Sequence, residues 1–273
     1  MATVEHAPAL PARRRRAPGW SVVGGQELRD LWLGGRGLLL SIAFSALLSI
    51  IAYLVATNTA LNFLEHRESV NLVLQVAIAV GGLLTLLAAA DAVSGERERG
   101  TLESALLSPV ARSQITTGKL LAALSLWLVA FAITVPYAWF LGRGVGIVGD
   151  VVVTGIVVGT LLAVFLASLG LIISLFATSN RASLSLSLFL LLALFAPTQL
   201  PSNAQKGWAG EVLLRVNPIT AGEHYVGKIL VSGHGWTEDL SWLASPLVAA
   251  VVFAVAAPVL GARFMRLRGG VAG

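Results

Sequence analysis

The sequence predicts an all-α integral membrane protein with six transmembrane helices. Of its 273 residues, 56% are hydrophobic and only 12% are charged, and the mean hydropathy is +0.82. A soluble domain carries about 25% charged residues. Several apolar runs also reach the ~20 residues that a helix needs to cross ~30 Å of hydrocarbon at ~1.5 Å per residue.

The predicted spans follow one another along most of the chain. They cover about residues 37–57, 72–93, 120–141, 151–177, 183–200 and 243–262. Small residues recur four apart within them and predict helix packing faces: Ser41, Ser45 and Ser49; Ala77, Gly81, Thr85 and Ala89; Gly155 and Gly159. Proline removes a backbone donor, so Pro197, Pro246 and Pro258 are expected to kink or end their helices.

The Lys and Arg residues predict the orientation. With the amino terminus inside, 14 of the 19 basic residues fall on the inner side and 5 on the outer side. Cytoplasmic loops carry the excess of basic residues, so both termini are expected in the cytosol as basic tails, residues 1–19 and 264–273. No small-residue cleavage site follows the first span, and we therefore expect no cleaved leader.

Two segments outside the spans carry amphipathic patterns. Leu28, Leu31 and Trp32 share one side of residues 20–36, which predicts a helix in the inner membrane interface rather than an irregular linker. Its polar side holds Gln26, Glu27, Arg29 and Asp30. The outer segment, residues 201–242, is predicted to form one or two short helices against the outer membrane surface, with Tyr225, Val226, Ile229 and Leu230 on one face.

Residue types exclude several classes of function. The chain has no cysteine, and His6, His66, His224 and His234 lack metal-ligand spacing, so no metal or cofactor site is expected. No serine-hydrolase or HExxH motif is present, and no filter-like loop suggests a channel. Asp91 is the only clear ionisable residue within a span, and we expect it to be paired or hydrated near the headgroups, which disfavours a proton-driven carrier.

The loop over residues 94–119, "SGERERGTLESALLSPVARSQITTGK", concentrates charge in a chain that otherwise avoids it. Arg99 and Glu103 have helical i, i+4 spacing, and Leu102, Ala105 and Leu106 share one helical face. Ser108-Pro109 has the pattern of a helix start. We expect a short helix whose apolar face docks into a groove of another protein, with the acidic residues at the rim; a merely solvated connector is the alternative.

This loop is similar to the cytosolic loop of ABC-2 type permeases, the membrane subunits of ABC exporters. The matching residues are Glu96, Glu98, Gly100, Thr101, Leu102, Glu103, Leu106, Leu107, Pro109, Val110, Arg112, Gly118 and Lys119. Asn217-Pro218 resembles a weaker pattern of the same family, and the order of spans agrees. The subgroup containing the nitrous-oxide-reductase maturation permease is the most similar.

The resemblance implies a type V exporter-like fold in a bacterial cytoplasmic membrane. Two permease subunits, either copies or relatives, would form the substrate pathway, and two cytosolic ATPase subunits would bind beneath it. ATP and Mg²⁺ would bind to those partners, since this chain has no GxxxxGK[ST] loop and is not expected to be an enzyme. Membrane lipid, and no nucleic acid, completes the expected partners.

The coupling residues implied by the resemblance and the loop pattern are Glu96, Glu98, Gly100, Thr101, Leu102, Glu103, Ala105, Leu106, Leu107, Pro109 and Arg112. The alternative function is a membrane anchor or regulator that recruits an ATPase without moving a substrate. The sequence does not name the substrate: drugs, lipids, peptides, ions and polysaccharide precursors stay open, although the uncharged spans favour amphiphilic cargo.

Overall fold

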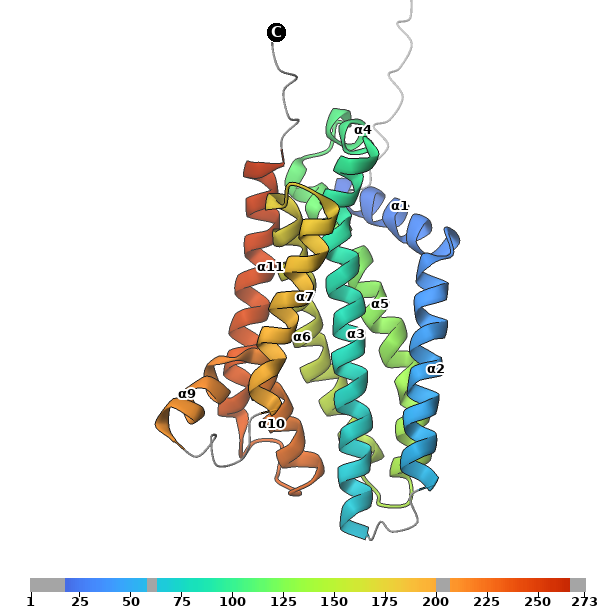
Figure 1. Ribbon diagram of the computed structural model, residues 1–273, viewed down its shortest axis with the longest axis vertical. Coiled ribbons are helices and arrows are strands. Elements are labelled where there is room, and N and C mark those ends of the chain that lie inside the picture. Colours follow the sequence, from blue (N-terminus) through green and yellow to red (C-terminus); the bar gives the residue numbers. More distant parts are fainter. Residues whose placement is uncertain (1–17, 58–62, 200–206, 266–273) are drawn as a thin grey trace, which may run out of the picture.

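The protein is a bundle of long helices with shorter helices at both ends (Figure 1). This computed structural model describes residues 18–57, 63–199 and 207–265, and within them every regular element is a helix. Six helical segments there are long and apolar enough to cross a membrane, which confirms the predicted all-α, six-span fold. The long helices are α2 (Arg36–Thr57), α3 (Phe63–Arg99), α5 (Arg112–Gly142), α6 (Val148–Phe176), α7 (Asn180–Phe195) and α11 (Ala244–Phe264).

The shorter helices lie at opposite ends of this bundle. Helices α1 (Gly19–Leu33) and α4 (Leu102–Leu107) lie at one end, which we call the α4 end. The other end, which we call the α10 end, carries η1 (Ala196–Gln199), α9 (Trp208–Val216), α10 (Pro218–Leu230) and η2 (Leu240–Leu243). The two predicted basic tails lie almost wholly outside the described residues.

Helices α3 and α5 extend well beyond the predicted apolar spans. The span predicted over residues 72–93 is part of a helix that runs from Phe63 to Arg99, and α5 begins at Arg112. The added turns are polar, with "HRES" at one end of α3 and "SGERER" at the other. Apolarity therefore located the membrane-crossing part of each helix, while the helical backbone continues past it.

Helices α3 and α6 form the interior of the bundle. The apolar window of α6 is 61% buried and that of α3 is 50% buried, whereas the corresponding windows of α2 and α11 are only 11% and 17% buried. Apolar side chains on α2, α7 and α11 are thus exposed on the bundle surface. In a membrane such surfaces contact lipid or another subunit.

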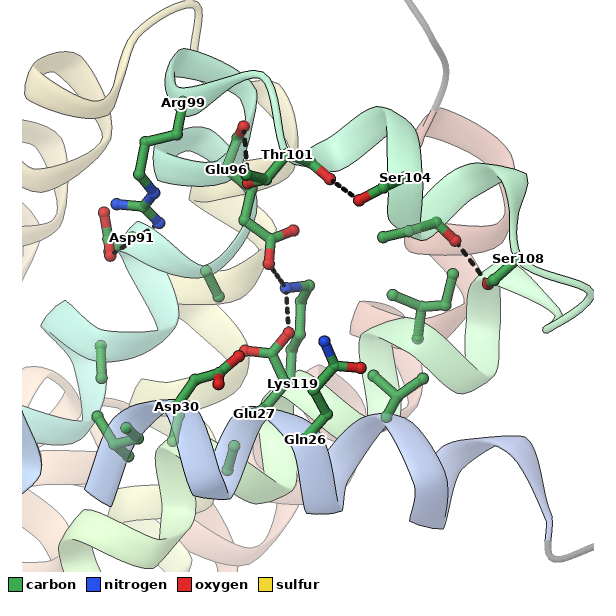
Figure 2. A pocket seen from close by; sticks show the side chains of 18 of the residues that line it. Gln26, Glu27, Asp30, Asp91, Glu96, Arg99, Thr101, Ser104, Ser108 and Lys119 are labelled. Carbon is green, nitrogen blue, oxygen red and sulfur yellow. Dashed lines mark hydrogen bonds and ion pairs between the residues drawn. The ribbon is translucent and has the colours of Figure 1, made fainter. Parts of the chain in front are cut away.

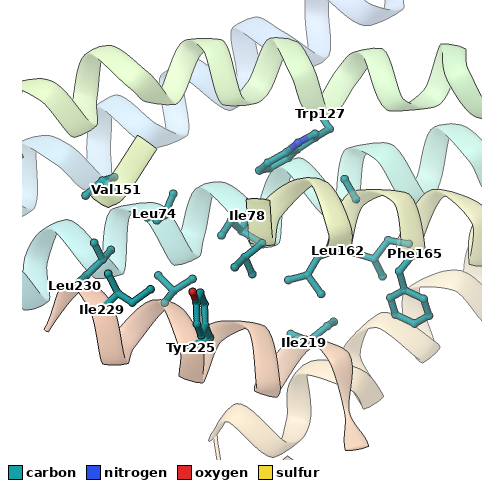
Figure 3. Packing of buried hydrophobic residues seen from close by; sticks show 14 of the residues in the cluster. Leu74, Ile78, Trp127, Val151, Leu162, Phe165, Ile219, Tyr225, Ile229 and Leu230 are labelled. Carbon is teal, nitrogen blue, oxygen red and sulfur yellow. The ribbon is translucent and has the colours of Figure 1, made fainter. Parts of the chain in front are cut away.

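An aromatic side chain fills the centre of the bundle. Trp127 of α5 is 1% exposed, and it packs against Gly81 of α3 and Gly159 of α6 (Figure 3). A Cβ atom at Gly159 would overlap the indole ring. Trp127 Nε1 donates a hydrogen bond to Thr160 Oγ1 at 3.1 Å. The small residues predicted as packing faces on these two helices are confirmed as packing faces, because they make room for this ring.

The serine face predicted on the first span also makes helix contacts. The hydroxyls of Ser45 and Ser49 lie 3.4 and 2.6 Å from the Tyr137 hydroxyl of α5. Ser41 instead donates to the carbonyl of Gly37 within its own helix, at 2.8 Å. Two of the three serines thus join α2 to α5.

Helix α10 corrects the prediction for the outer segment. Its predicted apolar face does not lie flat against a membrane surface but is buried in the bundle, with Tyr225 and Ile229 each 3% exposed and Val226 and Leu230 at 0% (Figure 3). Asn217 begins the helix by accepting a hydrogen bond from Ile219 N at 2.9 Å. The apolar face therefore fixes α10 on α3, α6 and α11.

The three prolines singled out in the sequence act differently. Pro197 lies in η1 directly after α7 and ends that helix, as predicted. Pro246 is the third residue of α11, where a helix needs no donor from it. Pro258 lies inside α11 and leaves the helix unbroken.

Candidate functional site

The charged loop forms a compact hairpin at the α4 end. Helix α3 ends at Arg99, and Gly100 follows with φ +71°, a conformation that favours glycine. Helix α4 ends at Leu107, and the next helix begins only at Arg112, so the predicted helix start at Ser108-Pro109 is wrong. The Ser108 hydroxyl instead donates to the Ala105 carbonyl at 2.7 Å, which satisfies an acceptor at the end of α4.

Helix α4 has an inner and an outer face, and they differ from the predicted ones. Leu102 is 4% exposed and belongs to the same buried cluster as Val93 and Ile115, so the prediction that it inserts into a partner is wrong. Ala105 and Leu106 are half-buried. Leu107, by contrast, is 78% exposed.

The exposed residues at this hairpin form what we call the α4 outer face. Its members are Thr101, Glu103, Ser104, Leu107, Pro109 and Arg112. It joins one large apolar side chain to an acidic and a basic one. This combination fits an interface with an apolar centre and a polar rim.

Glu96 lies inside the chain rather than at the rim of this face. The side chain of Lys119 is 0% exposed, and its Nζ contacts Glu96 Oε1 at 2.5 Å and Glu27 Oε1 at 2.6 Å (Figure 2). These two carboxylates come from α3 and α1. Glu27, which the sequence pattern placed on the polar side of the first helix, therefore points inward. One lysine of α5 thus connects three helices.

Close backbone contact brings α1 within reach of Lys119. A Cβ atom at Gly118 would lie 2.8 Å from the backbone nitrogen of Gly24, so neither helix has room for a side chain there. Glu27 lies three residues beyond Gly24, on the same helical face. Trp32 Nε1 adds a hydrogen bond to Ser125 Oγ of α5 at 3.0 Å.

The space beneath α4 is a pocket of about 750 Å³ between α1, α3, α4 and α5 (Figure 2). Its wall includes Glu27, Glu96 and Lys119, together with apolar side chains such as Val23 and Ile115. We call it the α4 pocket. Among the described residues, no group of three or more His, Asp and Glu side chains is placed to hold a metal ion.

Asp91 is paired, as expected for this residue. Its Oδ2 lies 3.1 Å from Arg36 Nη2 and 3.6 Å from Arg99 Nη2, and its Oδ1 accepts a hydrogen bond from Asn180 Nδ2 at 2.7 Å. Arg99 thus points back along α3 and not forward to Glu103, because Gly100 breaks the helix between them.

Two further side chains tie the end of α3 to the turn between α6 and α7. Glu98 Oε1 accepts a hydrogen bond from the backbone nitrogen of Asn180 at 2.8 Å. Arg97 donates to the carbonyls of Ala177 and Leu175 at 2.6 and 3.2 Å. The charges of "GERER" therefore serve mainly to fix the hairpin to the bundle.

The sequence contained a signal for the buried lysine that the prediction did not use. Lys119 follows Ile115 by four residues and precedes Ala122 and Ala123 by three and four, so it lies on an apolar helical face. A lysine in that position requires carboxylate partners. The identity of those partners, Glu27 and Glu96, depends on how the helices cross.

The chain matches the family model described as "ABC-2 family transporter protein" over residues 25–266. The chain belongs to the ABC-2 transporter family. This ABC-2 protein is therefore a multi-pass membrane permease component of an ABC transporter, and it is a transport component, not itself catalytic. An ABC transporter implies an ATPase partner for this ABC-2 chain. A search among curated proteins gave no match.

Proposed function

We propose that this permease is the membrane subunit of an ATP-driven exporter and that the α4 outer face binds its ATPase subunit. The observation that supports this proposal is the side chain of Leu107, which is 78% exposed on a helix that projects beyond the bundle (Figure 1). An exposed large apolar residue flanked by Glu103 and Arg112 suits the centre of a protein interface.

The anchoring of α4 suits the transmission of movement. Leu102 holds α4 in the buried cluster, and Lys119 joins the base of the hairpin to α1 and α3. A displacement of α4 by the ATPase would therefore move three helices together instead of bending one loop. This is the role of a coupling helix.

The assembly follows from the family resemblance. We propose two permease subunits, either two copies or a copy and a relative, with two ATPase subunits that bind ATP and Mg²⁺. The α4 end and both termini would lie in the cytosol of a bacterium, beneath its cytoplasmic membrane. Exposed apolar side chains on α7, among them Leu188, Phe189 and Leu192, offer a surface for the second permease. Membership of the nitrous-oxide-reductase maturation subgroup stays a prediction.

The substitution Leu107→Arg tests the docking face. A charge in the desolvated centre of an interface should reduce copurification of the ATPase by about tenfold or more. Leu33→Arg is the matched control, because Leu33 is 84% exposed on α1 and lies outside the α4 outer face. Equal ATPase recovery with the two variants would contradict the proposal.

Reconstituted complexes separate transport from the alternative of a membrane anchor. In a transporter, a transported substrate stimulates ATP turnover in nanodiscs, and Leu107→Arg abolishes that stimulation. An anchor would bind the ATPase through the same face without any substrate response.

Single cysteines test the orientation, since the chain has none of its own. With an impermeant thiol reagent, Gly144→Cys should react in intact cells, and Leu107→Cys only after the cells are opened. The reverse pattern would invert the topology. The position proposed earlier for the outer side, Lys206, lies outside the described residues.

A further inference from the structure

A second pocket lies at the α10 end, between α3, η1, α9 and α10. Its volume is about 350 Å³, and its polar lining includes Gln75, Thr198, Thr220, Glu223 and Lys228. We call it the α10 pocket. Because the opposite face of α10 is buried in the bundle, the polar side chains project from a fixed platform.

Two opposite charges line this pocket without pairing. Among the described residues, neither the carboxylate of Glu223 nor the ammonium of Lys228 has an ion-pair partner within 4.0 Å or a side-chain hydrogen bond. They are five residues apart on α10, so they project about 140° apart around the helix and are poorly placed to meet. Unpaired opposite charges in one pocket match a ligand that also carries both signs.

Amide groups of α3 add unused hydrogen-bonding capacity beside these charges. Gln75 lines the pocket, and its side chain makes no hydrogen bond to another described residue. One helical turn earlier, the Asn71 Oδ1 atom is buried without a partner. Unsatisfied polar groups within a membrane protein are costly and indicate a functional site.

The other charged groups near α10 are already engaged. Arg215 of α9 pairs with Glu211 at 3.2 Å, and Asp239 lies 2.7 Å from His234. His224 stacks on Trp242 with ring centroids 4.0 Å apart, and burial and the nearby Lys228 lower its pKa, which keeps it neutral near pH 7. From α3, Arg67 Nη1 donates to the Leu230 carbonyl at 3.5 Å.

From this arrangement we infer that the α10 pocket binds a zwitterionic group. Its ammonium would lie on Glu223, its phosphate on Lys228, and the amide of Gln75 would bond between them. The source is either a lipid headgroup, phosphoethanolamine attached to diacylglycerol, or the soluble zwitterion itself. The binding stands on this geometry alone, while a place for the site on a transport path rests on the proposed function.

Native mass spectrometry of the purified permease, without any ATPase, tests the lipid source. Glu223→Gln should lower the affinity for phosphatidylethanolamine by about tenfold and leave that for phosphatidylglycerol, which has no ammonium, unchanged. Lys228→Met should lower both affinities. Glu211→Gln is the matched control, because Glu211 is exposed on the neighbouring helix α9.

Calorimetry with phosphoethanolamine, again on the permease alone, tests the soluble source. Binding that Glu223→Gln weakens, without selective lipid binding, would assign the site to a soluble zwitterion. If Glu223→Gln and Glu211→Gln leave the affinities for both probes equal to those of the unmodified protein, the inference is overturned.

The pH dependence of binding adds a readout specific to the carboxylate. Burial raises the pKa of Glu223 to about 7. The ammonium pairs only with the ionised carboxylate, so phosphatidylethanolamine affinity should be higher at pH 8 than at pH 6 in the unmodified protein and unchanged with pH in Glu223→Gln. Since no ATPase takes part, failure here and failure of the docking face are distinguishable: Leu107→Arg should bind lipid normally.

Discussion

The two ends of the bundle treat their charged residues in opposite ways. At the α4 end, Lys119 is fully buried and satisfied by two carboxylates, and Asp91 is shared by Arg36 and Arg99. At the α10 end, Glu223 and Lys228 line a pocket and pair with no described residue. Composition does not distinguish these cases. Pairing does: charges that are satisfied inside the chain hold helices together, while unsatisfied ones are available to a ligand.

The substitution Lys119→Met should have the largest effect and would break this comparison if it did not. Removing one partner of a buried ion pair leaves unpaired buried charge, at a cost of about 3–5 kcal/mol. The melting temperature of the detergent-purified protein should fall sharply. Lys228→Met, at the other end, should leave it nearly unchanged.

A double substitution separates lost charge pairing from lost packing at this lysine. With Glu96→Gln added to Lys119→Met, one uncompensated carboxylate is removed, so part of the stability should return. No recovery in melting temperature would assign the effect of Lys119 to the packing of its side chain.

The substitution Gly159→Val asks whether the apolar centre between the two ends is equally demanding. A side chain there overlaps Trp127, and overpacking a close-packed interior costs about 1–3 kcal/mol. Gly144→Val, in an exposed turn with nothing near its Cβ position, is the control. Equal melting temperatures for the two variants would mean that Trp127 has room to move.

The substitution Glu223→Gln tests the unpaired charge through its pH dependence. Because the pKa of Glu223 is raised to about 7 in the folded protein, ionisation opposes folding, and stability falls as pH rises from the unfolded-state value of 4.5 towards 7. Glutamine cannot ionise, so this variant should melt higher than the unmodified protein at pH 8 and nearly equally at pH 4. A pH-independent difference would refute the raised pKa.

The smallest effect is expected at an exposed ion pair. Glu211 and Arg215 lie one helical turn apart on α9, and their side chains are 62% and 52% exposed. Solvent-exposed pairs of this kind contribute about 0.3–0.5 kcal/mol. Glu211→Gln should therefore barely change the melting temperature, which would also validate it as the control for lipid binding.

The long helices were predictable because apolar runs of sufficient length have one solution in a membrane. The hydrogen bonds of a helix are internal, so each run specifies its own structure without reference to its neighbours. The polar extensions of α3 were harder to predict, since "SGERER" has no apolar pattern that marks it as helix.

The candidate site was located from the sequence, but the directions of its side chains were not. Spacing grouped Leu102 with Ala105 and Leu106 on one face, yet Leu102 is buried and Leu107 is exposed. A six-residue helix has too few turns for spacing to tell which side meets the bundle. Likewise, Glu96 looked like a surface charge because its partner Lys119 lies 23 residues away in the chain, and Glu27 still farther.

Helix α3 runs unbroken from Phe63 to Arg99 and carries Glu96 of the α4 pocket and Gln75 of the α10 pocket. These residues are 21 positions apart, or about 32 Å along the helix axis. If the rod pivots by about 5° around Glu96, Gln75 is displaced by about 3 Å, the length of a hydrogen bond. The geometry of a lever would then let a small rotation on one side of the membrane make or break a ligand contact on the other.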